Sequence, residues 1–164
     1  MYPLYLINLF LSVILILTHF FLLRKGERMI KVFIDASTKG NPGSSGGGLM
    51  ITSENMYKQE SFAFSEMTNH QAEFEILLTA LERLIIEQLQ QETIMIYSDS
   101  KVVVQTIDKD YTNNESFLPY LLKFRQLQEQ FRLLILQWIP ENKNKGADNL
   151  ARQGLQKALK KQKK

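Results

Sequence analysis

Alternating apolar and polar residues predict three strands near the start of the folded part of the chain. Every second residue from 30 to 34 is a branched apolar residue, which is typical of a half-buried strand, and we expect this strand to end at Asp35. A turn rich in glycine and proline follows at residues 40–43, and an apolar run at residues 49–51 comes after three consecutive glycines. We therefore expect a hairpin, and residues 56–65, which mix aromatic and polar side chains, predict a third strand.

The rest of the chain predicts helices that alternate with two further strands. Apolar residues recur at intervals of three and four over residues 71–88, which predicts a long helix with Glu73 in its first turn. Short apolar segments at residues 93–97 and 132–138 predict the fourth and fifth strands. Further helices are predicted at residues 101–107, 117–131 and 145–159. The pattern indicates an α/β fold in which a mixed sheet carries helices on its faces.

Residues 1–28 differ from the remainder of the chain, because residues 1–23 contain no Asp, Glu, Lys or Arg and are rich in Leu, Ile and Phe. An apolar run of ~20 residues is long enough to span a bilayer as a helix, and the basic residues after it would leave the domain in the cytoplasm. Alternatively, residues 25–27 can be encoded by a purine run that contains a ribosome-binding sequence, so that Met29 is the true start. Both interpretations divide the chain into a hydrophobic segment at residues 1–28 and a cytoplasmic domain at residues 29–164, tethered to a membrane only in the first.

Composition excludes some kinds of site and leaves others open. The chain has no cysteine, so a disulfide framework and a thiolate metal site are both excluded. With 164 residues, 45% of them hydrophobic, it is suited to one globular domain plus one appendage. The net charge of +3 depends on five lysines in the last eight positions, so an argument for a nucleic-acid partner has to come from a site and not from the charge.

Four acidic residues occupy positions that suit metal ligands. Asp35 ends the first strand, Glu73 begins a helix, Asp99 ends the fourth strand and Asp148 lies on the last helix. If the first and fourth strands are neighbours, Asp35 and Asp99 converge, and gathered carboxylates repel one another unless cations compensate. Mg²⁺ prefers oxygen ligands, and two such ions ~4 Å apart can activate a water and stabilise the leaving oxygen in phosphodiester cleavage.

The segments around these acids resemble type 1 ribonuclease H. They are IDASTKGNPGSSGGGLMI (residues 34–51), MTNHQAEFEILLTALE (67–82), IYSDSKVVVQTI (96–107) and WIPENKNKGADNLARQGL (138–155). The resemblance covers residues 29–164 and none of residues 1–28. It implies the ribonuclease H-like fold, which is a five-stranded mixed sheet with three antiparallel strands followed by two parallel ones, flanked by helices.

The resemblance also implies an activity and the residues that perform it. The implied activity is that of a metal-dependent endonuclease that hydrolyses the RNA strand of RNA·DNA hybrids with two Mg²⁺ or Mn²⁺ ions per site and no small-molecule cofactor. We expect a monomer. The residues that match the family's catalytic metal ligands are Asp35, Glu73, Asp99 and Asp148. The residues that match positions in contact with the hybrid are Asn41, Gly43, Asn69 and His70.

Departures from the family keep alternative functions open. His70 stands where the family often has Asn or Gln, and the loop at residues 140–146 lacks the histidine that many members carry there. Glu141 or a lysine is a candidate substitute for that histidine, and the long basic protrusion of some bacterial members is missing. One alternative is therefore a catalytically weak or inactive protein of this fold that binds hybrid or duplex nucleic acid, and another is a membrane-tethered interaction protein. Trp138, which has apolar neighbours, is expected in the core rather than as a base-stacking platform.

Overall fold

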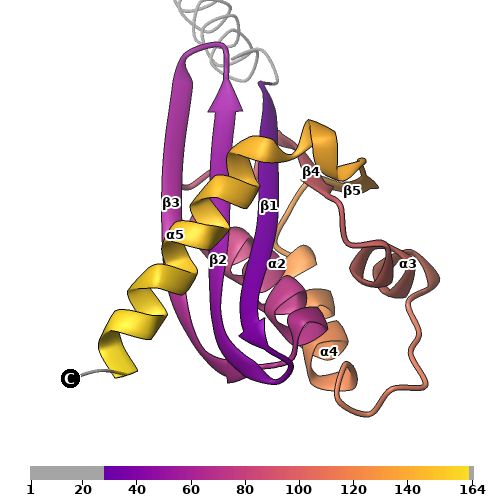
Figure 1. Cartoon of the computed structure of the whole chain (residues 1–164). Coiled ribbons are helices and arrows are strands. Elements are labelled where there is room, and N and C mark those ends of the chain that lie inside the picture. The colour runs from indigo at the N-terminus through magenta and orange to yellow at the C-terminus, as the bar shows by residue number, and fades with distance from the viewer. Residues whose placement is uncertain (1–27, 163–164) are drawn as a thin grey trace, which may run out of the picture.

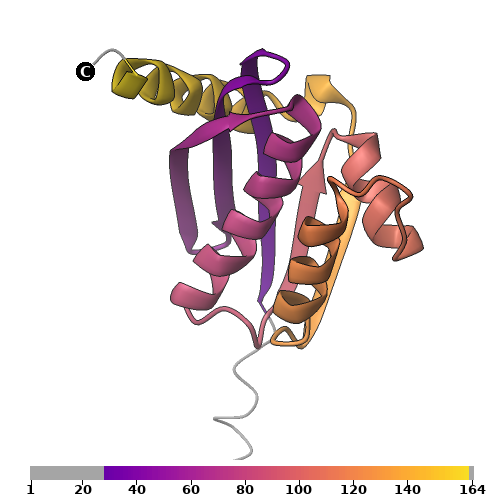
Figure 2. The same ribbon diagram turned by 90° about the horizontal axis from the view of Figure 1, so that it is seen from below.

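Residues 28–162, the part of the chain that the structure describes, form one five-stranded sheet with helices on both faces. In this computed structural model the strands lie in the order β3-β2-β1-β4-β5, with α5 across one face and α2 and α4 side by side on the other (Figures 1 and 2). The elements are β1 (Met29–Gly40), β2 (Gly43–Ser53), β3 (Met56–Met67), α2 (Asn69–Ile86), β4 (Thr93–Ser98), α3 (Lys101–Lys109), α4 (Leu118–Gln128), β5 (Leu133–Trp138), the 3₁₀ turn η1 (Glu141–Lys143) and α5 (Lys145–Gln162).

The pairing of the strands confirms the predicted mixed sheet. β1 pairs with β2, and β2 with β3, in antiparallel orientation, whereas β1 pairs with β4, and β4 with β5, in parallel orientation. The chain therefore forms a three-stranded meander, passes through α2 over one face and returns beside β1. This return brings β1 and β4, which are far apart in the sequence, into direct contact.

The core lies between the sheet and α2, because alternate residues of β1 and β4 and one side of α2 are apolar. Five of its fully buried side chains are Ile30, Ile34, Leu77, Leu81 and Ile96. These side chains fix the separation between α2 and the sheet, and with it the depth at which polar side chains from these elements can lie.

The glycines of β2 have a packing role that the sequence analysis did not predict. Gly46 and Gly48 lie within β2, directly under α5. A Cβ atom added at Gly46 would lie 2.0 Å from the backbone nitrogen of Leu155, and one added at Gly48 would lie 2.2 Å from the carbonyl oxygen of Ala147. The glycines therefore let the backbone of α5 approach the strand closely, a requirement that local turn propensity does not reveal.

The boundaries of β1 and α2 also differ from those predicted, and both differences concern acidic residues. β1 does not end at Asp35 but stays paired with β2 as far as Gly40, and only its pairing with β4 stops at Ile34. α2 begins at Asn69, where Thr68 and Gln71 form a capping box. Glu73 therefore lies one turn inside the helix, so the expectation that it lies in the first turn is wrong.

The hydrophobic segment predicted at residues 1–28 lies outside the described residues, apart from Arg28. Of the helices within residues 28–162, none has the length and apolar character needed to cross a membrane.

Replacing Gly46 by alanine is expected to lower the free energy of unfolding by ~1–3 kcal/mol, because the new methyl group has no space between β2 and the backbone of α5. Urea denaturation of the full chain, followed by circular dichroism, measures the change. The matched control is Gly146→Ala, whose Cβ would lie 3.3 Å from the flexible Met50 side chain and which exchanges glycine for a better helix former. Equal destabilisation by both variants would contradict the close contact between β2 and α5.

Candidate active site

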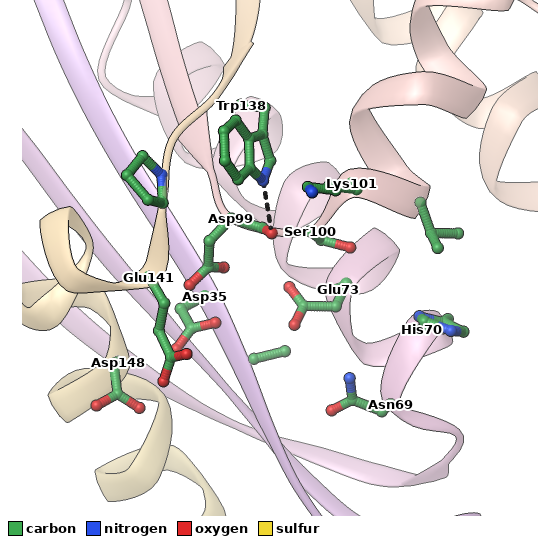
Figure 3. Close-up of a pocket in the computed structure, with 13 residues that line it drawn as sticks. Asp35, Asn69, His70, Glu73, Asp99, Ser100, Lys101, Trp138, Glu141 and Asp148 are labelled. Carbon is green, nitrogen blue, oxygen red and sulfur yellow. Dashed lines mark hydrogen bonds between the residues drawn. The ribbon is translucent and has the colours of Figure 1, made fainter.

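Three carboxylates from three elements meet in one pocket. Asp35 of β1, Glu73 of α2 and Asp99, directly after β4, each contribute an oxygen, and these three oxygens all lie within 4.8 Å of one another. Asp35 and Glu73 are buried, with 7% and 6% of their surface exposed, and Asp99 is half-buried. Figure 3 shows the three side chains pointing toward one another, with Asp148 on the far side of Asp35 from Glu73.

The parallel pairing of β1 with β4 causes this convergence. Ile34 opposite Ser98 is the last pair of the ladder between the two strands, so Asp35 and Asp99 are the next residue on each strand. Glu73 completes the cluster. Because α2 begins at Asn69, Glu73 lies in its second turn, beside the ends of the paired segments of β1 and β4.

Burial disfavours the charged forms of all three groups, and repulsion from the neighbouring acids adds to this at Asp35 and Glu73. Burial, and then the negative charge of Asp99, raise the pKa of Asp35 to about 8. The pKa of Glu73 lies well above its usual value, because the side chain is buried and faces the charges of Asp35 and Asp99. Burial also raises the pKa of Asp99. Oxygen Oε2 of Glu73 is buried and has no hydrogen-bond partner among the described residues. A hard divalent cation fits this cluster, since it would supply positive charge to three close oxygen ligands and a partner to Oε2 of Glu73.

Asp148 lines the same pocket but does not belong to the tight cluster of three. It lies in the first turn of α5, and its Oδ1 accepts a hydrogen bond of 2.9 Å from Nε of Arg152. Its charge nevertheless contributes to the raised pKa of Asp35. The structure thus brings all four predicted acids to one pocket of about 620 Å³, with three in close contact and the fourth at the side.

The four residues predicted to contact a hybrid divide into two groups. Asn69 and His70, at the start of α2, line the pocket, and the His70 ring packs edge-on against Phe117. Asn41 and Gly43 are not among the residues that line it. Asn41 instead accepts a hydrogen bond of 3.1 Å from the backbone N–H of Asn69, so it fastens the β1–β2 turn to the start of the helix. Gly43 is buried in that turn, where a Cβ would meet the carbonyl oxygen of Lys39.

Asn144 supports the acid cluster and was missed in the sequence. Only 1% of its surface is exposed, and its Nδ2 donates a hydrogen bond of 2.8 Å to the carbonyl oxygen of Ile34, the residue before Asp35. Its side chain also hydrogen-bonds to Asp99, which favours the charged form of that carboxylate. Its position just before α5 could have drawn attention to a capping role, but nothing local indicated the two distant strands.

The expectation that Trp138 is a core residue is wrong. The side chain lines the pocket and 40% of its surface is exposed. Its indole N–H donates a hydrogen bond of 3.0 Å to the carbonyl oxygen of Asp99, as Figure 3 shows. The ring lies at the surface because β5 is an edge strand and Trp138 is its last residue. Lys101 and Glu141 line the pocket beside it.

Known proteins share both the sequence pattern and the fold. Residues 33–154 match the family described as reverse transcriptase-like. The chain belongs to this family. It is 46% identical over 129 residues to a putative hydrolase, EbsB, of Enterococcus faecalis, an alignment that covers 79% of this chain and 96% of the relative. It is also 30% identical over 82 residues to a ribonuclease H of Trichodesmium erythraeum, where the alignment covers half of each protein.

A solved structure gives the same result for the fold. The crystal structure of LC11-RNase H1 in complex with an RNA/DNA hybrid superposes with a TM-score of 0.73 at 29% identity, over 79% of this chain and 99% of that one. This reverse transcriptase-like chain therefore has the ribonuclease H fold, as its four sequence segments implied. In sequence it spans about half the length of the curated ribonucleases H that it matches.

Without metal, the protein is expected to lose stability as the pH rises from about 4 to about 8. The pKa of Asp35 is about 8 in the folded chain against an ordinary value of 3.8, so within this window the folded state holds a proton that the unfolded state releases. The stability that this proton contributes is fully present below the ordinary pKa of 3.8. It is lost as the pH rises through the folded-state pKa of about 8. Urea denaturation in EDTA over a pH series measures the trend.

Two controls accompany this pH series. Asp35→Asn should show a shallower fall, because the residue with the raised pKa is removed. Saturating Mn²⁺ should also reduce the fall in the wild type, since a nearby cation favours the charged carboxylates. A wild-type free energy of unfolding that rises across the window in EDTA would refute the linkage.

Replacing Asn144 by alanine is expected to lower the free energy of unfolding by ~1–3 kcal/mol, because the buried carbonyl oxygen of Ile34 loses a donor. Chemical denaturation measures this loss. Asn142→Ala, an exposed position in the same turn, serves as the control and should have little effect. The role assigned to Asn144 would be wrong if the two variants were equally stable.

Proposed function

We propose that this protein is an endonuclease that hydrolyses the RNA strand of RNA·DNA hybrids with the help of divalent metal ions. The observation that carries the proposal is the buried cluster of Asp35, Glu73 and Asp99, found on a ribonuclease H fold in a member of the reverse transcriptase-like family. Three carboxylates, two of them buried, rarely lie this close together for a purely structural reason, because their repulsion costs stability.

The acidic residues would hold two ions of Mg²⁺ or Mn²⁺. The proposed ligands are Asp35, Glu73, Asp99 and Asp148. Two bound ions supply an activated water and stabilise the leaving oxygen of the phosphodiester. The protein's own contribution is to hold these carboxylates in place and, at Asp99, to favour the charged form by a hydrogen bond. Asn144 contributes to both, because it hydrogen-bonds the Asp99 carboxylate and the backbone just before Asp35.

The hybrid is the proposed substrate because polar side chains at the start of α2 lie beside the acids. Asn69 and His70 line the pocket next to Glu73 and offer hydrogen-bonding groups to a sugar or base edge. A 2′-hydroxyl is the group that distinguishes the RNA strand from the DNA strand. In this proposal Asn41 acts indirectly, by holding the backbone of Asn69, and Gly43 acts by permitting the tight turn.

A second candidate function is that of a slow or inactive protein that binds hybrids. The loop between β5 and α5 favours it, because residues 139–144 form only a short connection with the 3₁₀ turn η1 and contain no histidine. Glu141 lines the pocket from this turn but differs from histidine in its charge and in its ordinary pKa. Metal-dependent turnover separates the two candidates, since both predict binding.

Cleavage of a labelled RNA·DNA hybrid by the full chain is expected with Mg²⁺ or Mn²⁺, with the DNA strand left intact. Asp99→Asn should reduce the rate by ~10²-fold or more, because it removes a carboxylate from the cluster. Asp108→Asn is the matched control, since Asp108 is exposed on α3 and is not among the residues that line the pocket; it should retain activity. Activity that survives equally in both variants would point to a contaminating nuclease, and folded protein that binds but does not cut would favour the second candidate.

A further inference from the structure

One cation faces the acidic pocket, and it is held by an aromatic ring. Lys101 is the only lysine or arginine among the described residues that line the pocket, against five acidic residues: Asp35, Glu73, Asp99, Glu141 and Asp148. Its Nζ lies 4.9 Å from the centre of the Trp138 ring, in a cation–π contact. Within residues 28–162, no ion pair of Lys101 with a carboxylate is found, although so many carboxylates are near.

The position of Lys101 is unfavourable for the helix that carries it. Lys101 is the first residue of α3, directly after the N-cap Ser100. A positive charge at a helix N-terminus opposes the helix dipole, at a cost of ~0.3–1 kcal/mol. The side chain is also exposed, so its packing does not explain its presence. A cation kept at such a position, and turned toward the pocket, is suited to an anion that enters from solvent.

Two contacts restrain the Trp138 ring, one at its N–H edge and one at its face. The indole N–H is bound to the carbonyl oxygen of Asp99, and the ring face carries the Lys101 ammonium. One side chain therefore connects the backbone of a proposed metal ligand with the one pocket cation. Because two contacts restrain the ring, it can hold Lys101 at a constant distance from Asp99.

We propose that Lys101 binds a backbone phosphate of the nucleic acid beside the acid cluster, and that Trp138 is the positioning residue that holds both this lysine and the backbone of Asp99. The proposal rests on the proposed function and specifies how that site holds its substrate. Lys101 supplies charge to a phosphate that the surrounding carboxylates would otherwise repel. Trp138 acts through Lys101 and Asp99, and its N–H and its ring face have separate tasks.

The first test measures hybrid binding by the full chain in EDTA, where metal-dependent cleavage does not occur. Lys101→Gln is expected to raise the dissociation constant about fivefold and to reduce the slope of log K against log [salt] by about 1, as for the loss of one phosphate contact. Lys109→Gln is the matched control, because it removes the same charge from the other end of α3, away from the pocket. Equal effects of the two variants on affinity and slope would overturn the proposal.

The second test separates the two tasks of Trp138. Trp138→Phe keeps a ring beneath Lys101 but removes the hydrogen bond to Asp99, so the salt slope should match that of the wild type while kcat falls. Trp138→Leu removes both, so its salt slope should match that of Lys101→Gln. A ring with a purely structural role would give both variants the same salt slope, which would overturn the positioning role.

Fluorescence gives an independent readout, because Trp138 is the only tryptophan in the chain. Acrylamide quenching of its emission should decrease when hybrid is added, since the exposed part of the ring lies in the pocket that the substrate enters. Unchanged quenching at saturating hybrid would overturn the proposal. A wild-type chain that binds no hybrid at all would overturn the proposed function as well, whereas binding without cleavage would overturn only the enzymatic part and leave the lysine comparison decisive.

Discussion

The parallel pairing of β1 with β4 is the constraint on which the site depends. The ladder stops at Ile34 and Ser98, so the two residues that follow, Asp35 and Asp99, are forced side by side. Neither strand could place its carboxylate there alone, and a shift of one residue in register would turn one of the acids away. The apolar core beneath, where Ile30, Ile34 and Ile96 are fully buried, fixes this register and so sets the geometry of the site.

The same constraint has an electrostatic cost that the fold does not remove. Two unit charges 4 Å apart interact with ~4 kcal/mol at the effective dielectric constant of a protein surface, and here three carboxylates meet with partial burial. The neighbouring groups do not neutralise them: Asn144 and Trp138 are uncharged, and each donates to a main-chain oxygen at the cluster. They hold the acids in position without adding positive charge, so a divalent cation can supply the charge that the cluster lacks.

The acidic residues of the site could be predicted from the sequence. Residues whose roles depend on contacts with distant parts of the chain could not. Asp35, Glu73, Asp99 and Asp148 could be found because they lie at the ends of predicted strands or near the starts of predicted helices, and the resemblance to ribonuclease H then implied their role as metal ligands. The packing role of Gly46 and Gly48 was not predicted, because a glycine under a helix and a glycine in a turn look alike locally, and only the approach of α5 distinguishes them.

Trp138 and Asn144 were misjudged or missed for a related reason. Their partners lie 39 and 110 residues away in the chain, at Asp99 and Ile34, so no local pattern reveals them. An apolar run predicts burial for its last residue as well, but the end of an edge strand can leave a ring exposed beside a pocket.

The negative charge of the pocket affects how metal and substrate bind. A phosphate backbone approaching five acidic residues is repelled less once cations are bound, so metal and substrate should each raise the affinity for the other. Lys101 differs from the metal in this respect, because its charge is part of the chain and acts on the substrate before any ion arrives.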